Sequence, residues 1–391
     1  MKKANKIVLI LDILLLLVAV GVVGFFLSSK EDSRENQVAH STKPEQIQTK
    51  EPATKQPIGS DSMVSPSKTP EATVTPIPKK DTVITFTGDV LLTDYMINNY
   101  KKAGIRGLLD ENLYELLYHA DINMINEEFP FSKRGAPMKD KEYTFRTSPE
   151  YVSVLNDMGV DIVTLANNHV LDYGTDALLD TFTTLDDAGI KYVGAGKNID
   201  QAKRIQYFDV KGHRIAFIGA TRVIPVVEWN ATSTRPGMLS TYDPTATCEL
   251  IKEAKSQADY VVVYVHWGVE HKDRPVSYQQ NMGKQYIDSG ADIVVGTHTH
   301  CLQGVEFYKD KPIVYSLGNF IFSRKTTETA MIKLVIDSDG GMQLAMYPCE
   351  AVNGLTSMIT DKKKVKEFNA YMESISYDIH IDENQILRKS N

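Results

Sequence analysis

Four short motifs hold the side chains best suited to chemistry. They are Gly88-Asp89, Asn167-Asn168-His169, His266-Trp267-Gly268 and Thr297-His298-Thr299-His300. Each follows a short apolar run that is typical of a buried strand, at residues 83–86, 162–165, 260–265 and 293–295. Loops after the carboxyl ends of strands in an open α/β sheet share one rim. Carboxylate, amide and imidazole groups gathered there are suited to a metal ion, so the spacing predicts a metal site.

Each motif alone also has a plainer interpretation. Gly-Asp is a common turn, and an Asn-rich segment can simply cap a helix. A histidine at a strand end, such as His266, is usually structural. His298 and His300 carry more weight, because alternate residues after a strand can share one face. The four motifs together are therefore much stronger than any one of them.

Two neighbouring segments add acidic groups. If the strand expected at 121–125 extends further, the alternation of side chains turns Asn126 and Glu128 one way and Glu127 the other. Asp172 lies three residues beyond His169. If a helix begins there, Asp172 shares a face with His169 and can fix the tautomer of its imidazole.

Composition limits the classes of function. The chain has 391 residues and a net charge of −7, which argues against a nucleic-acid-binding protein. An anionic polymer would also be repelled on average, unless a local basic patch receives it. The three cysteines are widely spaced and indicate neither a disulfide framework nor a CxxC metal site. Cys301, beside His300, is better explained as a small buried residue than as a ligand.

The N-terminal region predicts a membrane anchor followed by a linker. Residues 1–6 contain three lysines, and residues 7–27 are apolar apart from Asp12. This run can cross a hydrocarbon core of ~30 Å, with residues 1–6 in the cytoplasm and the main domain outside. A cleaved signal peptide is the alternative, although its apolar core is usually only ~7–15 residues long. Residues 28–80 hold seven of the 16 prolines and read as a disordered linker.

The remainder alternates between strand and helix patterns. We expect strands at 82–87, 121–125, 161–165, 260–265 and 293–295, and hairpins at 206–218 and 305–316. We expect helices at 108–119, 149–158, 173–188, 244–257, 278–288 and 362–373. This order predicts α/β layers, and the hairpins predict mixed sheets. The main domain is expected at 81–350, followed by a C-terminal helix and tail at 351–391.

In this order the motifs resemble the CapA family of poly-γ-glutamate capsule biosynthesis proteins, over roughly residues 82–322. The resemblance includes Asn126-x-Glu128-x-Pro130, Phe145-Arg146-x-x-Pro149-Glu150, Asn167-Asn168-His169-x-x-Asp172, His266-Trp267-Gly268-x-Glu270 and Ser316-Leu317-Gly318-Asn319. That family looks related to calcineurin-like metallophosphoesterases. The resemblance therefore implies a four-layer α/β/β/α sandwich with a site for divalent metal, one or two ions of Mn, Zn or Fe.

By position, the resemblance implies a role for each matched residue. The implied metal ligands are Asp89, Glu128, Asn168, His266, His298 and His300. His169, supported by Asp172, would protonate a leaving group. The residues implied to contact substrate or support the ligands are Arg146, Asn167, Glu270 and Asn319. Leu91 stands where the phosphoesterase pattern has a histidine, so one metal, a weak two-metal site and a simple binding pocket all stay open.

Three functions follow as expectations. The first is a membrane-anchored extracytoplasmic protein for the biosynthesis or export of poly-γ-glutamate or a similar anionic capsule polymer, with membrane synthase subunits as partners. The second is an extracellular metal-dependent phosphoester hydrolase. The third is a non-catalytic scaffold of a membrane polymer-synthase complex. The motifs together with the anchor favour the first, and whether the protein is an enzyme stays open.

Overall fold

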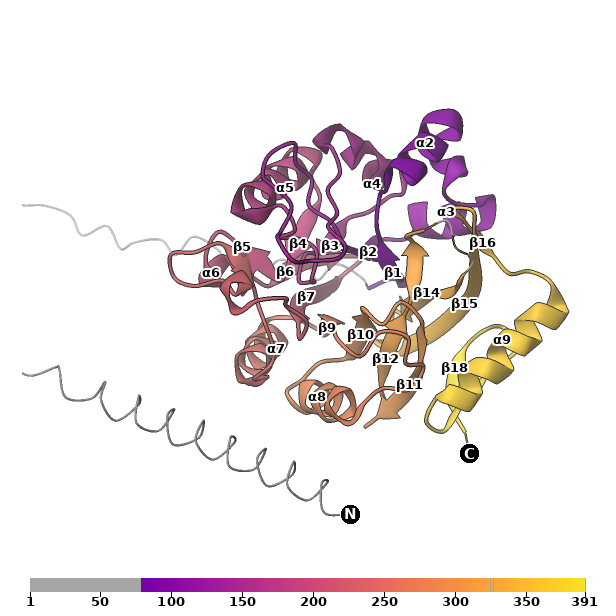
Figure 1. The fold of residues 1–391 in the computed structure, drawn as a ribbon. Helices are drawn as coiled ribbons and strands as arrows, with labels where there is room; N and C mark the ends of the chain where they lie inside the picture. Colours follow the sequence, from indigo (N-terminus) through magenta and orange to yellow (C-terminus); the bar gives the residue numbers. More distant parts are fainter. Residues whose placement is uncertain (1–78, 324, 326, 391) are drawn as a thin grey trace, which may run out of the picture. The chain divides into compact units, whose positions relative to one another are not determined.

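Two mixed β-sheets lie face to face at the centre of the fold (Figure 1). The structure is a computed structural model, and it describes residues 79–323, 325 and 327–390. The expected anchor at 7–27 lies outside this range, as does the expected linker apart from its last two residues. Among the described residues, none of the helices has the length and hydropathy needed to cross a membrane.

The larger sheet contains the strands that precede Asp89, Glu128 and Asn167. Its order is β16-β15-β14-β1-β2-β3-β4, and β13 (Asn319–Ile321) also pairs with β1. Its successive parallel strands are β1 (Thr82–Val90), β2 (Ile122–Glu127), β3 (Ile162–Thr164) and β4 (Lys191–Val193). Its antiparallel extension is β14 (Thr327–Ile336), β15 (Met342–Val352) and β16 (Leu355–Met358).

The smaller sheet contains the strands that precede the histidine motifs. Its order is β11-β12-β10-β9-β7-β6. The four central strands run parallel and are β7 (His213–Thr221), β9 (Tyr260–His266), β10 (Ile293–Thr297) and β12 (Lys311–Leu317). The antiparallel edges are β6 (Gln206–Val210) and β11 (Leu302–Tyr308). The prediction of mixed α/β sheets is therefore confirmed.

Three apolar clusters hold four layers together. Phe86 and Val262 belong to the cluster between the two sheets. Phe182 belongs to a second cluster, under the helices on the outer face of the larger sheet: α2 (Asp94–Ala103), α3 (Glu111–Tyr118), α4 (Ser153–Asp157) and α5 (Gly174–Ala188). Tyr286 belongs to the third, under α7 (Thr245–Gln257) and α8 (Ser277–Asp288) on the smaller sheet. Figure 1 shows these two helix groups on opposite sides of the sheets.

Local chemistry explains several differences from the expected elements. The helix expected at 108–119 begins only at Glu111, because the side chain of Asp110 accepts from the N–H of Leu113 and caps it. The helix expected at 149–158 is a 3₁₀ turn followed by the short α4. The helix α2 was not expected. The boundary expected at residue 350 falls inside β15, so the larger sheet continues through β16.

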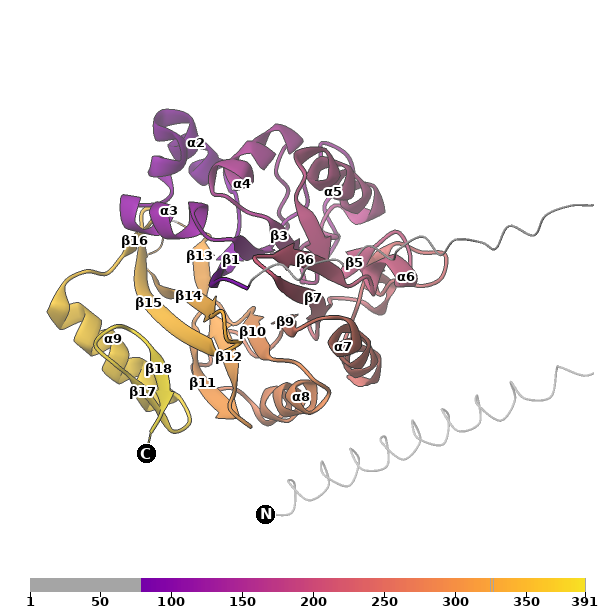
Figure 2. The same cartoon turned by 180° about the vertical axis from the view of Figure 1, so that it is seen from behind.

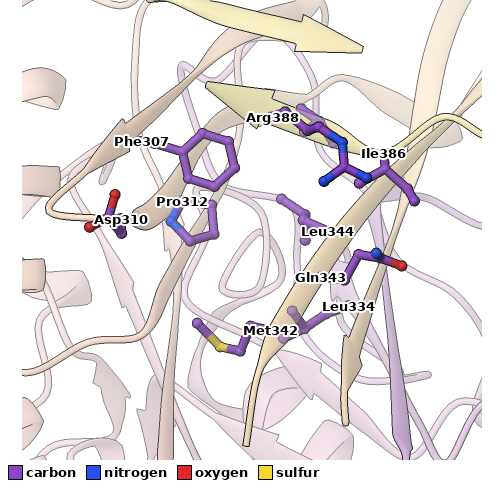
Figure 3. A pocket seen from close by; sticks show the side chains of 10 residues that line it. Phe307, Asp310, Pro312, Leu334, Met342, Gln343, Leu344, Ile386 and Arg388 are labelled. Atoms are coloured by element: carbon purple, nitrogen blue, oxygen red, sulfur yellow. The ribbon is translucent and has the colours of Figure 1, made fainter. Parts of the chain in front are cut away.

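The C-terminal segment covers the open end of the layer between the sheets. Helix α9 (Lys362–Ile375) packs Phe368, Met372 and Ile375 into that layer, together with β17 (Ile379–Ile381) and β18 (Leu387–Lys389) (Figure 2). A cavity of ≈ 140 Å³ lies beside this segment, lined by residues such as Phe307, Asp310 and Arg388 (Figure 3). These residues lie at the ends of the strands opposite the motif-bearing rim, so the cavity is separate from the candidate site.

Candidate metal centre

The carboxyl ends of the parallel strands bring the predicted motifs to one rim. Asp89 of β1 lies in register with Asn126 of β2 on one side and with Asn319 of β13 on the other. Gly88 makes this approach feasible, because a Cβ at that position would lie 1.9 Å from the carbonyl oxygen of Gly318. The glycine therefore lets β1 reach the turn that precedes Asn319.

Three buried ligand groups form the centre of the cluster. Asp89, Glu128 and His266 each offer one ligand atom, and these atoms lie within 4.8 Å of one another. All three residues are inaccessible to solvent. The side-chain amide of Asn126 donates to Asp89 Oδ1 (2.8 Å) and to Glu128 Oε2 (3.4 Å), which holds the two carboxylates side by side. A pair of acids and an imidazole at this spacing is a donor set for a divalent cation.

His266 is held by polar atoms on both sides of its ring. Its Nε2 lies 2.8 Å from Asn168 Oδ1 and 3.8 Å from Glu128 Oε1. Its Nδ1 lies 3.1 Å from the hydroxyl of Thr297. Burial, reinforced by the neighbouring histidines, lowers the pKa of His266 well below its usual value. The ring is therefore neutral at physiological pH, which is the form that binds metals.

His298 and His300 adopt backbone angles that non-glycine residues rarely take. Their φ values are +98° and +56°. Such strain tends to occur at functional sites, where the surrounding structure holds it. It places the two rings on the cluster, with centroids 6.0 Å apart, and the centroid of His298 4.7 Å from that of His266. His300 Nδ1 lies 2.8 Å from Asn319 Oδ1 and 3.6 Å from Asp89 Oδ2.

Several buried atoms of the cluster lack the partner that a cation would supply. Glu128 Oε1 and His298 Nδ1 are shielded from solvent and have no hydrogen-bond partner among the residues that the structure describes. Burial and the adjacent Asp89 raise the pKa of Glu128 well above its usual value. Burial also lowers the pKa of His298 to about 3. A divalent cation would stabilise both carboxylates and accept the imidazole lone pairs, so the residues present fit such an ion.

A second group, beside the cluster, is suited to proton transfer. His169 Nδ1 lies 2.7 Å from Asp172 Oδ2, and its Nε2 lies 4.0 Å from Glu128 Oε1. Asp172 also accepts from the backbone N–H of Phe145 (2.7 Å) and forms an ion pair with Lys141. The ammonium group of Lys141 donates to the carbonyl oxygen of Asn168 and lies 3.1 Å from His169 Nδ1. Lys141 thus ties the proton-transfer pair to the backbone of a predicted metal ligand.

Two aromatic side chains cover the histidines. The ring of Phe145 lies 4.5 Å from that of His169, and the ring of Phe322 lies 4.8 Å from that of His300. The two phenylalanine rings meet edge to face, 6.3 Å apart. His169 and His298 are almost inaccessible to solvent, at 6% and 5% exposure. Burial is accordingly the largest influence on the pKa of His169, which is lowered despite the bond to Asp172.

Not all predicted site residues join the cluster. Asn167 supports it, since its amide donates to Asn126 Oδ1 (3.0 Å) and its oxygen accepts from the N–H of His169 (3.0 Å). Arg146 is exposed and instead donates to the carbonyl oxygen of Arg134 and lies over the ring of Tyr173. Glu270 is exposed and has no ion pair within the described part of the chain.

Three polar residues of the site, like the two phenylalanines, were not among the predicted site residues. Lys141 comes from the irregular segment between β2 and Pro149, where the sequence shows no periodicity. Thr297 closes β10 and contacts His266. Asn126 lies in a recognised motif, and its alternation with Glu128 was the signal that could have identified it. Leu91, at the position of the missing histidine, is buried in the apolar cluster under the helices and lies outside the site.

Fold and site together define an α/β protein with a buried donor set at the rim of two sheets. The family model for the bacterial capsule synthesis protein PGA_cap matches residues 83–324. The chain belongs to this family, which confirms the resemblance seen in the motifs.

Individual relatives agree with this assignment. The chain is 32% identical to a capsule biosynthesis protein CapA of Bacillus anthracis over 295 residues, covering 72% of this chain and 71% of that protein. It is 33% identical to a PGA biosynthesis protein CapA of Bacillus subtilis over 270 residues, covering 68% and 70%. Among solved structures, a phosphatase of Mycoplasma pneumoniae aligns with a TM-score of 0.47 and 12% identity, covering 74% of this chain and 97% of that one.

Proposed function

We propose that the protein acts outside the cytoplasmic membrane in the synthesis, export or attachment of a capsule polymer of the poly-γ-glutamate type. Membership of the capsule synthesis family supports this function. The length and apolar character of residues 7–27 support a single-pass anchor, with residues 1–6 in the cytoplasm. The partners would then be an anionic polymer and the subunits of a membrane synthase.

Within that function, we propose that the rim cluster is a divalent-metal centre of metallophosphoesterase type. The convergence of Asp89, Glu128 and His266 within 4.8 Å, with a buried Glu128 oxygen that has no partner, carries this proposal. One or two ions of Mn, Zn or Fe would be held by Asp89, Glu128, Asn168, His266, His298 and His300. A bound ion would supply the positive charge that stabilises a reacting anionic group.

The residues around the cluster would prepare a proton-transfer step. Asp172 fixes Nδ1 of His169, which leaves Nε2 on the side of Glu128 to hold or move a proton. Phe145 and Phe322 limit the access of water to His169 and His300, the two histidines that they cover. This arrangement favours a second candidate function, the hydrolysis of an extracellular phosphoester. A non-catalytic scaffold would not require an imidazole in a fixed orientation.

Complementation of a capsule-producing deletion strain tests the proposal. The wild-type gene should restore the amount and length of surface polymer, and Glu128→Gln and His266→Ala should not, at equal protein levels in the membrane. Full restoration by both variants would support the scaffold instead. Hydrolysis of phosphomonoesters and phosphodiesters by the purified protein with Mn²⁺ or Zn²⁺, lost in the same variants, would support the hydrolase.

A further inference from the structure

A second charged group lies on the same rim, outside the metal cluster. Arg222 follows β7 directly, and its backbone N–H donates to the carbonyl oxygen of His266 (2.8 Å). Thr221 is in register with His266 on the neighbouring strand. Because side chains alternate, that of Arg222 turns to the opposite face, toward α8. There its guanidinium carbon lies 3.9 Å from the ring centroid of Tyr278 and 5.0 Å from that of Tyr242.

The guanidinium of Arg222 has no ion-pair partner in the described part of the chain. Four other described arginines pair with acids, namely Arg106, Arg134, Arg214 and Arg388. Three donate to backbone carbonyl groups, namely Arg146, Arg235 and Arg274. Arg204 is exposed to water. Arg222 is half-buried, its Nε is shielded from solvent without a partner, and no described acid forms an ion pair with it. A shielded N–H group without an acceptor is unfavourable, and an external anion that accepts from Nε would relieve this.

The side chain of Tyr278 and the backbone beside Tyr242 are fixed before any ligand arrives. The hydroxyl of Tyr278 accepts from the N–H of Gly268 (2.7 Å) and donates to its carbonyl oxygen (3.1 Å). Tyr242 follows Thr241, whose N–H donates to the carbonyl oxygen of Thr221 (2.7 Å). The ring of Tyr242 is nevertheless 50% exposed, so the group is open to solvent on that side. The fixed ring of Tyr278 loses little entropy when a ligand binds beside it.

We propose that Arg222, Tyr242 and Tyr278 form a subsite for a carboxylate of the polymer, next to the metal centre on the rim. This inference rests on the proposed function and specifies how the polymer is recognised. A planar guanidinium matches a carboxylate with two parallel hydrogen bonds. The tyrosine rings offer apolar surface to the aliphatic carbons between successive carboxylates. Polyphosphate would meet the same charge but has no aliphatic carbons, so the arrangement favours a carboxylate polymer.

Binding of a γ-linked glutamate oligomer to the purified full-length protein tests this subsite. Arg222→Met should weaken binding at least about tenfold, the loss expected for one charge-assisted contact. Arg222→Lys should recover only part of the lost binding, because lysine keeps the positive charge but lacks the planar guanidinium that forms two parallel hydrogen bonds. Arg204→Met, an exposed arginine without an acceptor, is the matched control and should bind like the wild type. Tyr242→Ala changes a half-exposed side chain, so it should fold normally and bind several-fold more weakly.

Unchanged binding in Arg222→Met or Tyr242→Ala would overturn the subsite. Polyphosphate is the competing ligand. If it binds as tightly as the glutamate oligomer, and Arg222→Met weakens both equally, the choice of a carboxylate polymer is wrong. The metal content of the variants distinguishes a failure of this subsite from a failure of the proposed metal centre. Arg222→Met should keep its metal, whereas His266→Ala should lose it. If Arg222→Met binds normally while His266→Ala fails to restore polymer in cells, only the subsite is wrong. If His266→Ala restores polymer fully while Arg222→Met binds weakly, the metal function is wrong and the subsite stands.

Discussion

The imidazole of His169 is held by Asp172 through a 2.7 Å contact between Nδ1 and Oδ2. The opposite ring nitrogen lies 4.0 Å from Glu128 Oε1. One ring edge is thus occupied by a positioning carboxylate, and the other faces the candidate metal centre. This geometry allows the proposed proton transfer and the proposed metal binding to be tested separately.

Replacement of His169 should therefore spare the metal and impair turnover. We expect His169→Ala to keep wild-type metal content, because its ring is not among the three closely spaced ligand groups. We expect it to lose about 10²-fold or more in rate, the usual contribution of a general acid or base. Metal analysis and a rate assay on the same preparation check this. Loss of metal together with activity would show that His169 is a ligand instead.

Lys141 should control the orientation of that ring. Its ammonium group contacts both Asp172 and the carbonyl oxygen of Asn168. In Lys141→Met we expect Asp172 to lose its ion pair and His169 to populate a second tautomer. Nitrogen chemical shifts of the His169 side chain report the tautomer directly. Lys133→Met, which removes an exposed lysine on the same segment, is the control. An unchanged tautomer in Lys141→Met would contradict a positioning role.

The buried acid Glu127 should make stability depend on pH. It is fully buried, and neither of its carboxylate oxygens has a hydrogen-bond partner within residues 79–323, 325 and 327–390. Burial raises its pKa well above the usual value. An acid whose pKa is raised in the folded state lowers stability as pH rises from its unfolded value near ~4.5 through the folded value. Glu127→Gln should therefore be more stable than the wild type at neutral pH, by roughly 1–3 kcal/mol.

Denaturant unfolding between pH 4.5 and 8, with metal removed by a chelator, measures this effect. The difference between Glu127→Gln and the wild type should shrink toward pH 4.5. The exposed Glu270→Gln should show no such trend. A constant difference across the range would mean that Glu127 does not titrate differently in the folded state.

The sequence predicted mixed α/β sheets and motifs that meet at one rim. The roles assigned to the individual site residues stay predictions. Strands such as β9 and β10 are short apolar runs that end at polar motifs, and parallel pairing brings their ends to one rim. Lys141 and Arg222 could not be foreseen, because each acquires its role only through contacts with residues that are remote along the chain. The extension of the larger sheet by β14–β16 was missed because its strands pair antiparallel beyond the motif-bearing region. Arg146 was predicted near the site, but its guanidinium reaches a loop carbonyl.

The most direct test is the metal content of the purified full-length protein, compared with Glu128→Gln and His266→Ala. His380→Ala is the control, because His380 is exposed and pairs with Glu373 (2.9 Å) away from the cluster. His271 is less suitable as a control, because its ring centroid lies only 6.3 Å from that of His300. We predict near-stoichiometric divalent transition metal in the wild type and the control, and its loss in both site variants. Wild-type protein that holds no metal after reconstitution, or site variants that retain it, would contradict the assignment of a metal centre.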